Sequence, residues 1–572
     1  MSSEAKAGTV GAGVVGPGGV KHMKWWGWGV DGVGFHHEGK PKFPAFVLNA
    51  VGLDLLAAVP VSEPSFDDVP IAASVAPESL LHALREITGD EAVVTDNLLR
   101  AIHTYGKSLR DLVRMRANLV ERWVDVVVYP EDEAQVLAIV RAAVEHNAVL
   151  IPFGGGSNIA GSLEPIATET RPVISLDMGR LRAVIAVDAD SRLARIQAGS
   201  MGPDLEAQLG EQGWTLGHFP DSFTHSSVGG WAATRSSGMQ SDKYGDIADI
   251  VRGIRVARPG GILEIQPAPS ASNGPSVREM IIGSEGRLGV ITEVTVQVHR
   301  IPEQRQVNAY FFGDWATGLK ALQAIAESDA APSITRISDS NETGFSLATS
   351  KGSSGIAKFI SGTVIPKMMT GRGWDLEKIC LSFIGYEGTP EHVKRTKRLV
   401  DGIVKAHGGF GVGTGPGVLF DQKKFDTPYL RDFLLDRGAA GDVSEFCFNG
   451  SATPEIYTAV YAAANAAYDS LGRKGWIMSH LSHSYHSGAC LYFTFAFVFG
   501  DDPVAEYDLV KRAIQQAFVD HGGSISHHHG VGVEHSPWIE EDISTEAVAV
   551  MRGLFTSADP GNNFNPGKIL PD

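Results

Sequence analysis

Three consecutive histidines, His527, His528 and His529, stand near the end of the chain. An imidazole exchanges protons close to neutral pH and also binds metal ions, so such a triplet can serve acid–base catalysis or a metal site. Consecutive side chains cannot all converge on one ion in a regular strand or helix, and no cysteine or carboxylate stands at the usual ligand spacing. We therefore expect no metal. Gly530 and Gly532 follow at once, which favours a tight turn that holds the imidazoles in place over a solvated loop.

Two further side chains could take part in the same chemistry. Tyr492 lies in the aromatic-rich segment 485–499, which predicts a buried strand or pair of strands. Its phenol could transfer a proton if neighbouring positive charge moved the pKa toward the working pH, and a core tyrosine bonded to the backbone is the alternative. Arg431 lies in a helix predicted to begin after Pro428. As a lone arginine it is expected to be a surface charge or an ion-pair partner, for example of Asp432.

A glycine-rich segment upstream is typical of a loop that binds a pyrophosphate. It follows the apolar run 148–151, which is itself preceded by a predicted strand over 123–130 and a predicted helix over 131–147. The loop therefore lies where a buried parallel strand ends, and such sheets bind ligands there. Bare glycines let backbone N–H groups approach phosphate oxygens, and a plain turn is the alternative. The segment consists of Pro152, Phe153, Gly154, Gly155, Gly156, Ser157 and Asn158.

Two further segments rich in glycine and small side chains follow in the same α/β region. Each alone could be a turn, but three such segments in order indicate a cofactor that lies against the backbone. The fingerprint GxGxxG at residues 11–16 has neither a strand before it nor a helix after it, so we expect no Rossmann site there. The candidates in the second segment are Pro220, Asp221, Ser222, Ser226, Ser227, Gly229, Gly230, Thr234, Arg235, Ser236 and Ser237. The candidates in the third segment are Glu285, Gly286, Leu288, Gly289, Val290 and Ile291.

The composition excludes several classes of protein. The 572 residues suffice for two or three domains, and 43% hydrophobic with 20% charged residues is typical of a globular protein. A net charge of −17 argues against binding nucleic acid. The three widely spaced cysteines match neither a disulfide framework nor a CxxC metal pattern, and we find neither a secretory signal nor an apolar run of membrane-spanning length. We therefore expect a cytoplasmic protein.

The order of the three glycine-rich segments resembles the FAD-binding domain of the vanillyl-alcohol oxidase and p-cresol methylhydroxylase flavoproteins. Within that family, the chain is similar to the alkyldihydroxyacetonephosphate synthases from Met23 to the end. This closer likeness extends to MKWWGWG at 23–29, YLRD at 429–432, YHSGACLYF at 485–493 and SHHHGVG at 526–532. The resemblance implies FAD as the cofactor. We expect non-covalent FAD, because no histidine or cysteine of the anchoring kind stands near the phosphate loop.

The resemblance also implies an activity. Such an enzyme exchanges the acyl group of acyl-dihydroxyacetone phosphate for a fatty alcohol, without net redox change, through an adduct at flavin N5. The implied partners are these lipid-like substrates, the membrane surface in peripheral contact, and a second copy in a homodimer. An FAD-dependent oxidoreductase acting on a 2-hydroxy acid or other alcohol is the alternative, and an inactive flavoprotein scaffold ranks last. The candidates for proton transfer are Tyr492, His527, His528 and His529, and those for substrate binding are Arg431, Arg336 and Ser444.

We expect an α+β protein in which the active site lies between a two-subdomain FAD-binding module and an antiparallel-sheet cap, because ligand sites favour domain interfaces. The C-terminal helical part, with its histidine-rich loop, should fold back onto that interface. The expected divisions are a flexible tail at 1–22, an arm and helical region at 23–118, the FAD-binding domain at 119–301, the cap at 302–500 and the C-terminal part at 501–572.

Overall fold

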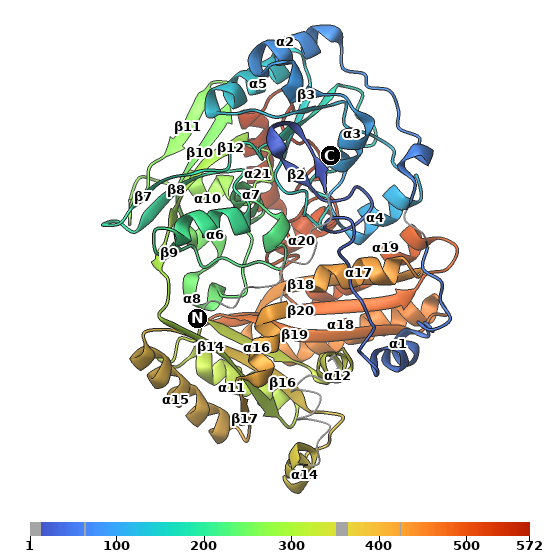
Figure 1. Cartoon of the computed structure of the whole chain (residues 1–572), viewed down its shortest axis with the longest axis vertical. Coiled ribbons are helices and arrows are strands. Elements are labelled where there is room, and N and C mark those ends of the chain that lie inside the picture. Colours follow the sequence, from blue (N-terminus) through green and yellow to red (C-terminus); the bar gives the residue numbers. More distant parts are fainter. Residues whose placement is uncertain (1–12, 62–63, 350–363, 424, 572) are drawn as a thin grey trace.

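The computed structural model describes residues 13–61, 64–349, 364–423 and 425–571. Figure 1 shows two lobes stacked along the long axis of the molecule. The upper lobe holds a four-stranded and a five-stranded sheet, and the lower lobe is built on a seven-stranded sheet. Helices cover these sheets. The predicted α+β class, with a two-subdomain module and an antiparallel cap, is confirmed.

The first subdomain is a small sheet in the order β3-β4-β6-β5, in which β4 and β5 run parallel to β6. Its central strands are apolar and almost entirely buried, as expected for a parallel sheet covered on both faces. The helix α5 begins at its cap Asp132, whose carboxylate accepts a hydrogen bond from the Gln135 N–H. The elements are α2 Glu78–Thr88, β3 Val93–Val94, α3 Asn97–Thr104, α4 Leu109–Arg116, β4 Val126–Val128, α5 Glu133–Glu145, β5 Val149–Phe153 and β6 Val173–Asp177.

The second subdomain is an antiparallel sheet in the order β11-β10-β12-β8-β7. One face packs against α6 and α7 in a core that includes Leu205, Trp231 and Val294. The strands are β7 Val184–Asp188, β8 Leu193–Gln197, β9 Trp214–Thr215, β10 Val251–Arg258, β11 Gly261–Ile265, β12 Val290–Gln297 and β13 His299–Arg300. The helices are α6 Gly202–Gly210, α7 Val228–Thr234, α8 Ser241–Tyr244, α9 Ile247–Ile250 and α10 Val277–Ile281.

The cap is an antiparallel sheet in the order β17-β14-β16-β15-β19-β20-β18. Its register places Tyr492 of β20 between His480 of β19 and Glu445 of β18, so these three side chains share one face of the sheet. The strands are β14 Gln304–Phe312, β15 Ile334–Ser338, β16 Cys380–Gly388, β17 Phe410–Gly413, β18 Ala439–Asn449, β19 Gly475–Ser484 and β20 Gly488–Val498. The helices are α11 Trp315–Ala326, α12 Ser340–Ala348, α14 Val364–Gly371, α15 Pro390–Ala406, α16 Gly415–Lys423, α17 Thr427–Leu435 and α18 Thr453–Ser470.

The N-terminal arm is part of the folded body. Residues 1–12 of the predicted flexible tail lie outside the described residues, but β1 Val14–Val15 and β2 Lys21–His22 form a hairpin, so the tail prediction does not hold beyond residue 12. His22 is buried against the first subdomain, which fixes the hairpin. The next helix, α1 Phe43–Val51, packs instead on the cap, against α12, β19 and β20.

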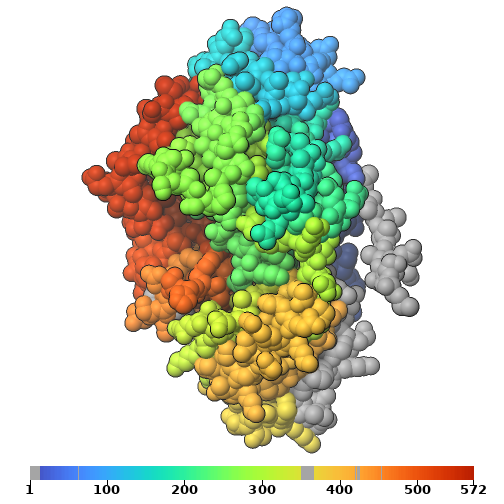
Figure 2. All heavy atoms as spheres, turned by 90° about the vertical axis from the view of Figure 1, so that its left-hand side faces the viewer, coloured from blue at the N-terminus to red at the C-terminus, as the bar shows by residue number. Residues whose placement is uncertain are grey.

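The C-terminal part, expected to be one helical unit, divides between the two lobes. Helix α19, Pro503–Asp520, packs on α18 and β18 of the cap. The helices α20 Ile539–Ile543 and α21 Thr545–Ala558 belong to the core of the second subdomain. Figure 2 shows these last residues, in red, beside the green surface of that subdomain. The loop between α19 and α20 therefore crosses the interface between the lobes.

Candidate active site

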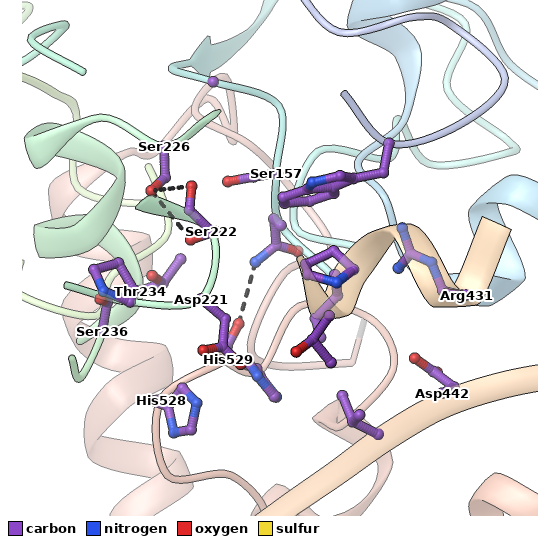
Figure 3. Close-up of a pocket in the computed structure, with 18 of the residues that line it drawn as sticks. Ser157, Asp221, Ser222, Ser226, Thr234, Ser236, Arg431, Asp442, His528 and His529 are labelled. Atoms are coloured by element: carbon purple, nitrogen blue, oxygen red, sulfur yellow. Dashed lines mark hydrogen bonds between the residues drawn. The ribbon is translucent and has the colours of Figure 1, made fainter. Parts of the chain in front are cut away.

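A cavity of about 300 Å³ lies between the module and the cap. Figure 3 shows the hydroxyl groups of Ser157, Ser222 and Ser226 on one side of it and Arg431 on the other. The histidine-rich loop forms a further part of the wall, because His529 also lines the cavity. Segments far apart in the sequence thus converge here, as expected.

The phosphate loop and the second segment approach so closely that only glycine fits between them. A Cβ atom on Gly155 would overlap the carbonyl oxygen of His225, and one on Gly154 would overlap the Ser227 hydroxyl. Gly156 has a φ of +70°, which favours glycine as well. These contacts leave backbone N–H groups unobstructed by side chains along the cavity wall, as a pyrophosphate requires.

Most of the residues predicted to bind the cofactor line this cavity. Four do not: Arg235 reaches Glu279 at the surface, Ser237 donates to Asp246, and Leu288 and Val290 are core residues. The predicted residues that line it are Pro152, Phe153, Gly154, Gly155, Gly156, Ser157, Asn158, Pro220, Asp221, Ser222, Ser226, Ser227, Gly229, Gly230, Thr234, Ser236, Glu285, Gly286, Gly289 and Ile291.

Two of these residues tie the module to the histidine-rich loop. The Asn158 side chain donates to the His529 carbonyl at 3.2 Å. The buried Glu285 carboxylate accepts hydrogen bonds from the Val531 N–H at 2.6 Å and the Gly532 N–H at 2.9 Å. Burial raises the pKa of Glu285, and these donors oppose that shift. Glu285 therefore anchors the loop that carries the histidines.

Glu445 of β18 holds the other side of the same loop and was not found by the sequence analysis. Its carboxylate accepts from the backbone N–H groups of His527, His528 and His529 at 2.5, 3.1 and 3.0 Å. The side chain is 2% exposed. A carboxylate between the apolar residues of a predicted strand was the available signal, although β18 also contains Asp442, because a buried charge needs such partners.

Tyr492 lies at the centre of this arrangement. Its ring stacks on His480 with centroids 4.8 Å apart, and it lies 6.0 Å from the ring of His528 and 5.7 Å from that of His529. Burial raises the pKa of the phenol well above its usual value, and the carboxylates of Asp221 and Glu445 raise it further. The phenol is therefore protonated at neutral pH, and neighbouring positive charge does not move its pKa toward the working pH.

The histidines themselves are neutral. Burial lowers the pKa of both His527 and His528 to about 3, and it lowers that of His529 well below the usual value. A neutral imidazole can accept a proton at one nitrogen and donate at the other. The loop thus offers proton acceptors beside a phenol that can donate.

Arg431, on α17, presents unsatisfied donors at the cavity. One of its terminal nitrogens donates to the Lys107 carbonyl, and Nε forms the expected ion pair with Asp432 at 3.9 Å, but neither Nε nor Nη2 has a hydrogen-bond partner among the described residues. Trp28 also lines the cavity, and its buried indole N–H likewise has no hydrogen-bond partner among the described residues. Burial lowers the pKa of Lys107 to about 7. Unsatisfied buried donors of this kind are costly unless an anion fills the space beside them.

Three predicted site residues do not line this cavity. Arg336 forms an ion pair with Glu342 at 2.6 Å and contacts His480, which itself stacks on Tyr492. Ser444 is buried in β18 and is 1% exposed. His527 faces a second, more polar cavity, which it lines together with Tyr485. Arg336 and His527 are therefore next to residues of the site.

The remaining wall is apolar, and the sequence analysis identified only part of it. The segment around Tyr492 contributes Thr494, Phe495 and Ala496. Helix α1 supplies a second face that was missed, although its apolar residues recur at helical spacing, which was the signal. The apolar lining residues from α1 and its neighbours are Phe43, Phe46, Val47, Ala50, Val51, Phe345, Leu430, Leu434, Trp476 and Met478.

Comparison with known proteins gives a consistent result. The family profile "FAD binding domain" matches residues 124–265, and "FAD linked oxidases, C-terminal domain" matches residues 301–569. The alkyldihydroxyacetonephosphate synthase of Dictyostelium discoideum is 36% identical over 96% of this chain and 94% of its own. That of Trypanosoma brucei brucei is 33% identical over 96% and 93%.

Solved structures agree with the sequence relatives. One of an alkyldihydroxyacetonephosphate synthase has a TM-score of 0.83 at 33% identity and covers 95% of this chain and 98% of its own. One of p-cresol methylhydroxylase, at 15% identity, has a TM-score of 0.65 over 86% and 97% of the two chains and shares the fold.

The geometry of the cavity fits FAD, the cofactor that the matched family profiles and relatives indicate. The glycine contacts at Gly154 and Gly155 leave backbone exposed along one wall, and hydroxyl side chains stand beside it, as a dinucleotide needs. FAD is the cofactor of this protein. The cavity continues past the flavin segments to Arg431 and the apolar face of α1, which leaves room for a substrate. The chain belongs to the alkyldihydroxyacetonephosphate synthase family of FAD-binding flavoproteins.

Proposed function

We propose that the protein replaces the acyl group of acyl-dihydroxyacetone phosphate with a fatty alcohol, which gives an alkyl ether without net redox change. The observation that carries this proposal is the pairing of Arg431 with an apolar wall in one cavity. The free guanidinium donors fit a phosphate dianion, and the face formed by α1 fits a hydrocarbon chain. The names of the relatives support the same reaction.

FAD, held without a covalent bond, supplies an electrophilic ring system that makes substitution next to the ketone feasible. In the exchange, the bond from C1 of the substrate to the acyl oxygen breaks, and the fatty acid leaves as a carboxylate. The alcohol oxygen forms the new bond to C1, and its proton goes to the enzyme or to solvent. Atoms and charge therefore balance without an electron acceptor.

Tyr492, His528 and His529 are proposed to move these protons. The protonated phenol donates to an oxygen of the substrate as negative charge develops there. The neutral imidazoles accept the proton that the incoming alcohol loses. His527 lies behind His528, with the two Nδ1 atoms 2.9 Å apart, and continues the path to Tyr485 at the second cavity.

Long-chain substrates reach such a cavity most directly from a bilayer, and the chain offers an apolar surface for that purpose. The segment that includes and follows α1 exposes Leu48, Leu56, Val59 and Val61, of which Val59 is 85% exposed. The opposite face of the same helix lines the cavity. We propose that this surface contacts the membrane peripherally. No helix among the described residues is long and apolar enough to cross a membrane.

The oligomeric state and the compartment stay predictions. A homodimer follows from family analogy alone, and a sedimentation measurement would test it. The three cysteines, Cys380, Cys447 and Cys490, are free thiols, which supports a reducing compartment such as the cytoplasm.

The decisive experiment is an anaerobic incubation of the FAD-loaded protein with palmitoyl-dihydroxyacetone phosphate and hexadecanol, followed by mass spectrometry. We expect hexadecyl-dihydroxyacetone phosphate and palmitate in equal amounts, with the flavin spectrum still oxidised at the end. A reaction without hexadecanol is the control and should give no ether. Flavin bleaching by a 2-hydroxy acid, with no ether from the lipid substrates, would instead establish the oxidoreductase and overturn the proposal.

A further inference from the structure

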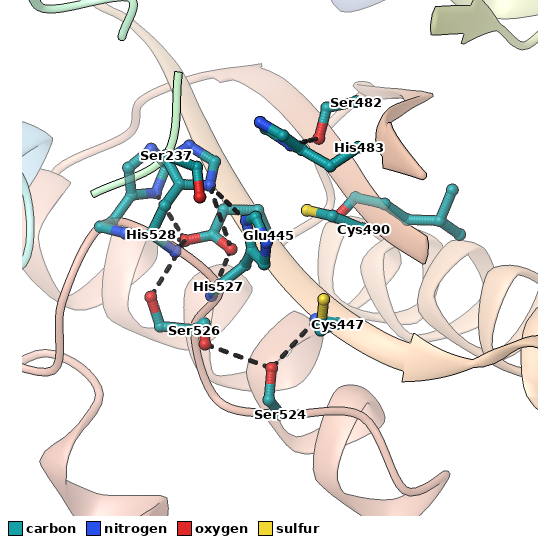
Figure 4. A network of polar contacts seen from close by, with 12 residues as sticks. Ser237, Glu445, Cys447, Ser482, His483, Cys490, Ser524, Ser526, His527 and His528 are labelled. Carbon is teal, nitrogen blue, oxygen red and sulfur yellow. Dashed lines mark hydrogen bonds and ion pairs between the residues drawn. The ribbon is translucent and has the colours of Figure 1, made fainter. Parts of the chain in front are cut away.

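A cluster of nitrogen and sulfur ligands lies behind the catalytic wall. His483 of β19, Cys490 of β20, and His527 and His528 of the histidine-rich loop each offer one ligand atom, and these four atoms lie within 4.8 Å of one another. Figure 4 shows that the side chains come from three separate segments of the fold. From the sequence, we weighed only the histidine triplet as a metal site. The pairing of β19 with β20 brings in the other two ligands.

Hydrogen bonds orient two of the imidazoles for metal binding. Nε2 of His483 lies 3.0 Å from the Gly238 carbonyl, which can only accept, so Nε2 carries the proton, and Nδ1 accepts from the Ser482 hydroxyl at 2.8 Å, a hydrogen bond that a cation bound at Nδ1 would replace. Nε2 of His527 lies 2.5 Å from the Tyr485 hydroxyl, which in turn donates to Asp246 at 2.9 Å. The Nδ1 lone pair of His527 therefore points to Nδ1 of His528, 2.9 Å away, and a cation bound beside the two rings would replace that hydrogen bond. Metal-binding histidines almost always have such an outer partner.

The protonation states suit the same role. A metal-binding imidazole must be neutral, and a metal-binding cysteine binds as the thiolate. A bound divalent cation deprotonates a coordinating thiol, so binding would release one proton to solvent.

The chemistry of the four ligand atoms determines which class of cation they would bind. Three imidazole nitrogens and one thiolate form a tetrahedral set that Zn²⁺ prefers, whereas Mg²⁺ and Ca²⁺ prefer oxygen ligands. The backbone of the loop is also held in place, since Glu445 accepts from the N–H groups of both His527 and His528. The four ligand atoms lie within 4.8 Å of one another, so shifts of the side chains are needed to bring them to one ion.

We propose that His483, Cys490, His527 and His528 bind one soft divalent cation, Zn²⁺ or a cation of similar chemistry, and that binding inhibits the enzyme. The inhibition has a direct cause. His528 lines the substrate cavity and faces the ring of Tyr492 at 6.0 Å, so a bound ion would occupy the nitrogen lone pair that accepts a proton. The inhibition rests on the proposed function, but the cation site does not.

Binding is tested with Co²⁺, which replaces Zn²⁺ and absorbs visible light when it is tetrahedral. The FAD-loaded protein is titrated while its absorption is followed at wavelengths longer than those of the flavin. We expect ligand-field bands that saturate at one cation per chain, with release of one proton measured by a pH indicator. Zn²⁺ should then displace Co²⁺ and remove the bands. A protein that shows no such bands would overturn the proposal.

Variants show which ligands are used. Cys490→Ser should weaken binding by more than about 100-fold, and Tyr485→Phe, which removes an outer partner, by about 10-fold. Cys447→Ser is the matched control, because Cys447 lies directly opposite Cys490 in the β18–β20 register but outside the ligand set. It should bind as tightly as the parent protein. The flavin spectrum of each variant checks that it is folded, and His483→Gln replaces Cys490→Ser if the latter is not.

Two outcomes separate this inference from the proposed function. Unchanged Co²⁺ affinity in Cys490→Ser and His483→Gln, or loss of binding in Cys447→Ser, would overturn the cation site whatever the enzyme catalyses. Cation binding by the parent protein, together with a failure to form the ether product, would leave the site standing and overturn the proposed reaction. Inhibition of ether formation by Zn²⁺ that Cys490→Ser relieves at least tenfold is the expected result.

Discussion

Oε1 of Glu445 lies 3.0 Å from the backbone nitrogen of His529 and 3.2 Å from Nδ1 of the same residue. The carboxylate thus fixes both the main chain and the imidazole of a residue that lines the substrate cavity. The contact joins β18 of the cap to a loop that Glu285 holds from the module. Two buried carboxylates from different lobes therefore determine where the histidines stand.

Replacing Glu445 with glutamine should destabilise the protein. The amide keeps one acceptor oxygen, but its NH2 group faces backbone N–H donors that it cannot satisfy. The loss should be about 3 kcal/mol in the free energy of unfolding, measured in urea. The exposed Glu455→Gln is the control and should change stability by less than about 0.5 kcal/mol. Equal stability of the two variants would contradict the anchoring role.

Arg431 and Arg336 should respond differently to substitution by lysine. Arg431→Lys keeps the charge but loses the planar fork, so KM for acyl-dihydroxyacetone phosphate should rise about 100-fold, equivalent to about 3 kcal/mol. Arg336→Lys should change KM only a few-fold, because Arg336 does not line the cavity. Steady-state kinetics of both variants, with FAD content measured alongside, check this. A larger effect at Arg336 would show that the substrate phosphate binds elsewhere.

Loss of the Tyr492 hydroxyl should affect chemistry and leave the cofactor bound. Tyr492→Phe should lower kcat by about 10³-fold, within the range for a group that transfers protons, with an unchanged flavin spectrum. Tyr468→Phe is the matched control, because Tyr468 is also buried in the cap but donates to the Trp476 carbonyl instead of facing the cavity. Single-turnover measurements would show whether the chemical step is slowed. Substantial activity in Tyr492→Phe would exclude it as a proton donor.

Stability should fall as the pH falls from about 6.5 toward 4. Several buried histidines, among them His218, His527 and His528, have a pKa lowered to about 3, so the unfolded chain binds protons that the folded chain does not. Buried carboxyl groups whose pKa is raised act in the opposite sense. Asp339, with a pKa of about 7, binds a proton in the folded chain and so stabilises the fold as the pH falls below neutrality. Such carboxyl groups are fewer than the histidines whose pKa is lowered. Urea unfolding at several pH values measures the slope.

A variant pair tests the histidine contribution directly. His528→Asn removes one imidazole whose pKa is lowered by burial. The slope of the unfolding free energy against pH should therefore decrease by about 1.4 kcal/mol per pH unit between pH 4 and 6. The same substitution at His82, whose side chain is exposed, should leave the slope unchanged. If both variants keep the parent slope, His528 is not the neutral, buried group described above.

The exposed apolar segment after α1 should control binding to lipid surfaces. Leu56→Asp combined with Val59→Asp should reduce co-flotation with phosphatidylcholine vesicles at least tenfold, since each charge opposes entry into an apolar layer. The double variant should keep its flavin spectrum and its stability, because both side chains are more than three-quarters exposed. Val550→Asp, at an exposed site on α21, is the control. Equal flotation of all three proteins would place the membrane contact elsewhere.

Much of this protein was determined by local sequence. The alternation of strand and helix before Pro152, the glycines that follow, and the order of the three segments predicted the FAD module, because backbone approach to a phosphate demands those residue types at that place. The aromatic segment 485–499 predicted the buried strand β20 that carries Tyr492, whereas its hairpin partner β19, which lies before that segment, was not assigned. The family resemblance supplied the roles of Tyr492 and Arg431.

The rest depended on contacts between residues far apart in the chain. Glu445 is a buried carboxylate in β18, and the docking of a loop more than 80 residues away gives it its backbone partners. The raised pKa of Tyr492 likewise comes from burial between the lobes. His483 and Cys490 join His527 because antiparallel pairing brings two strands beside one loop. Residue types and local spacing fixed what chemistry was available, whereas burial and long-range pairing, which no local pattern encodes, decided which groups meet and in which protonation state.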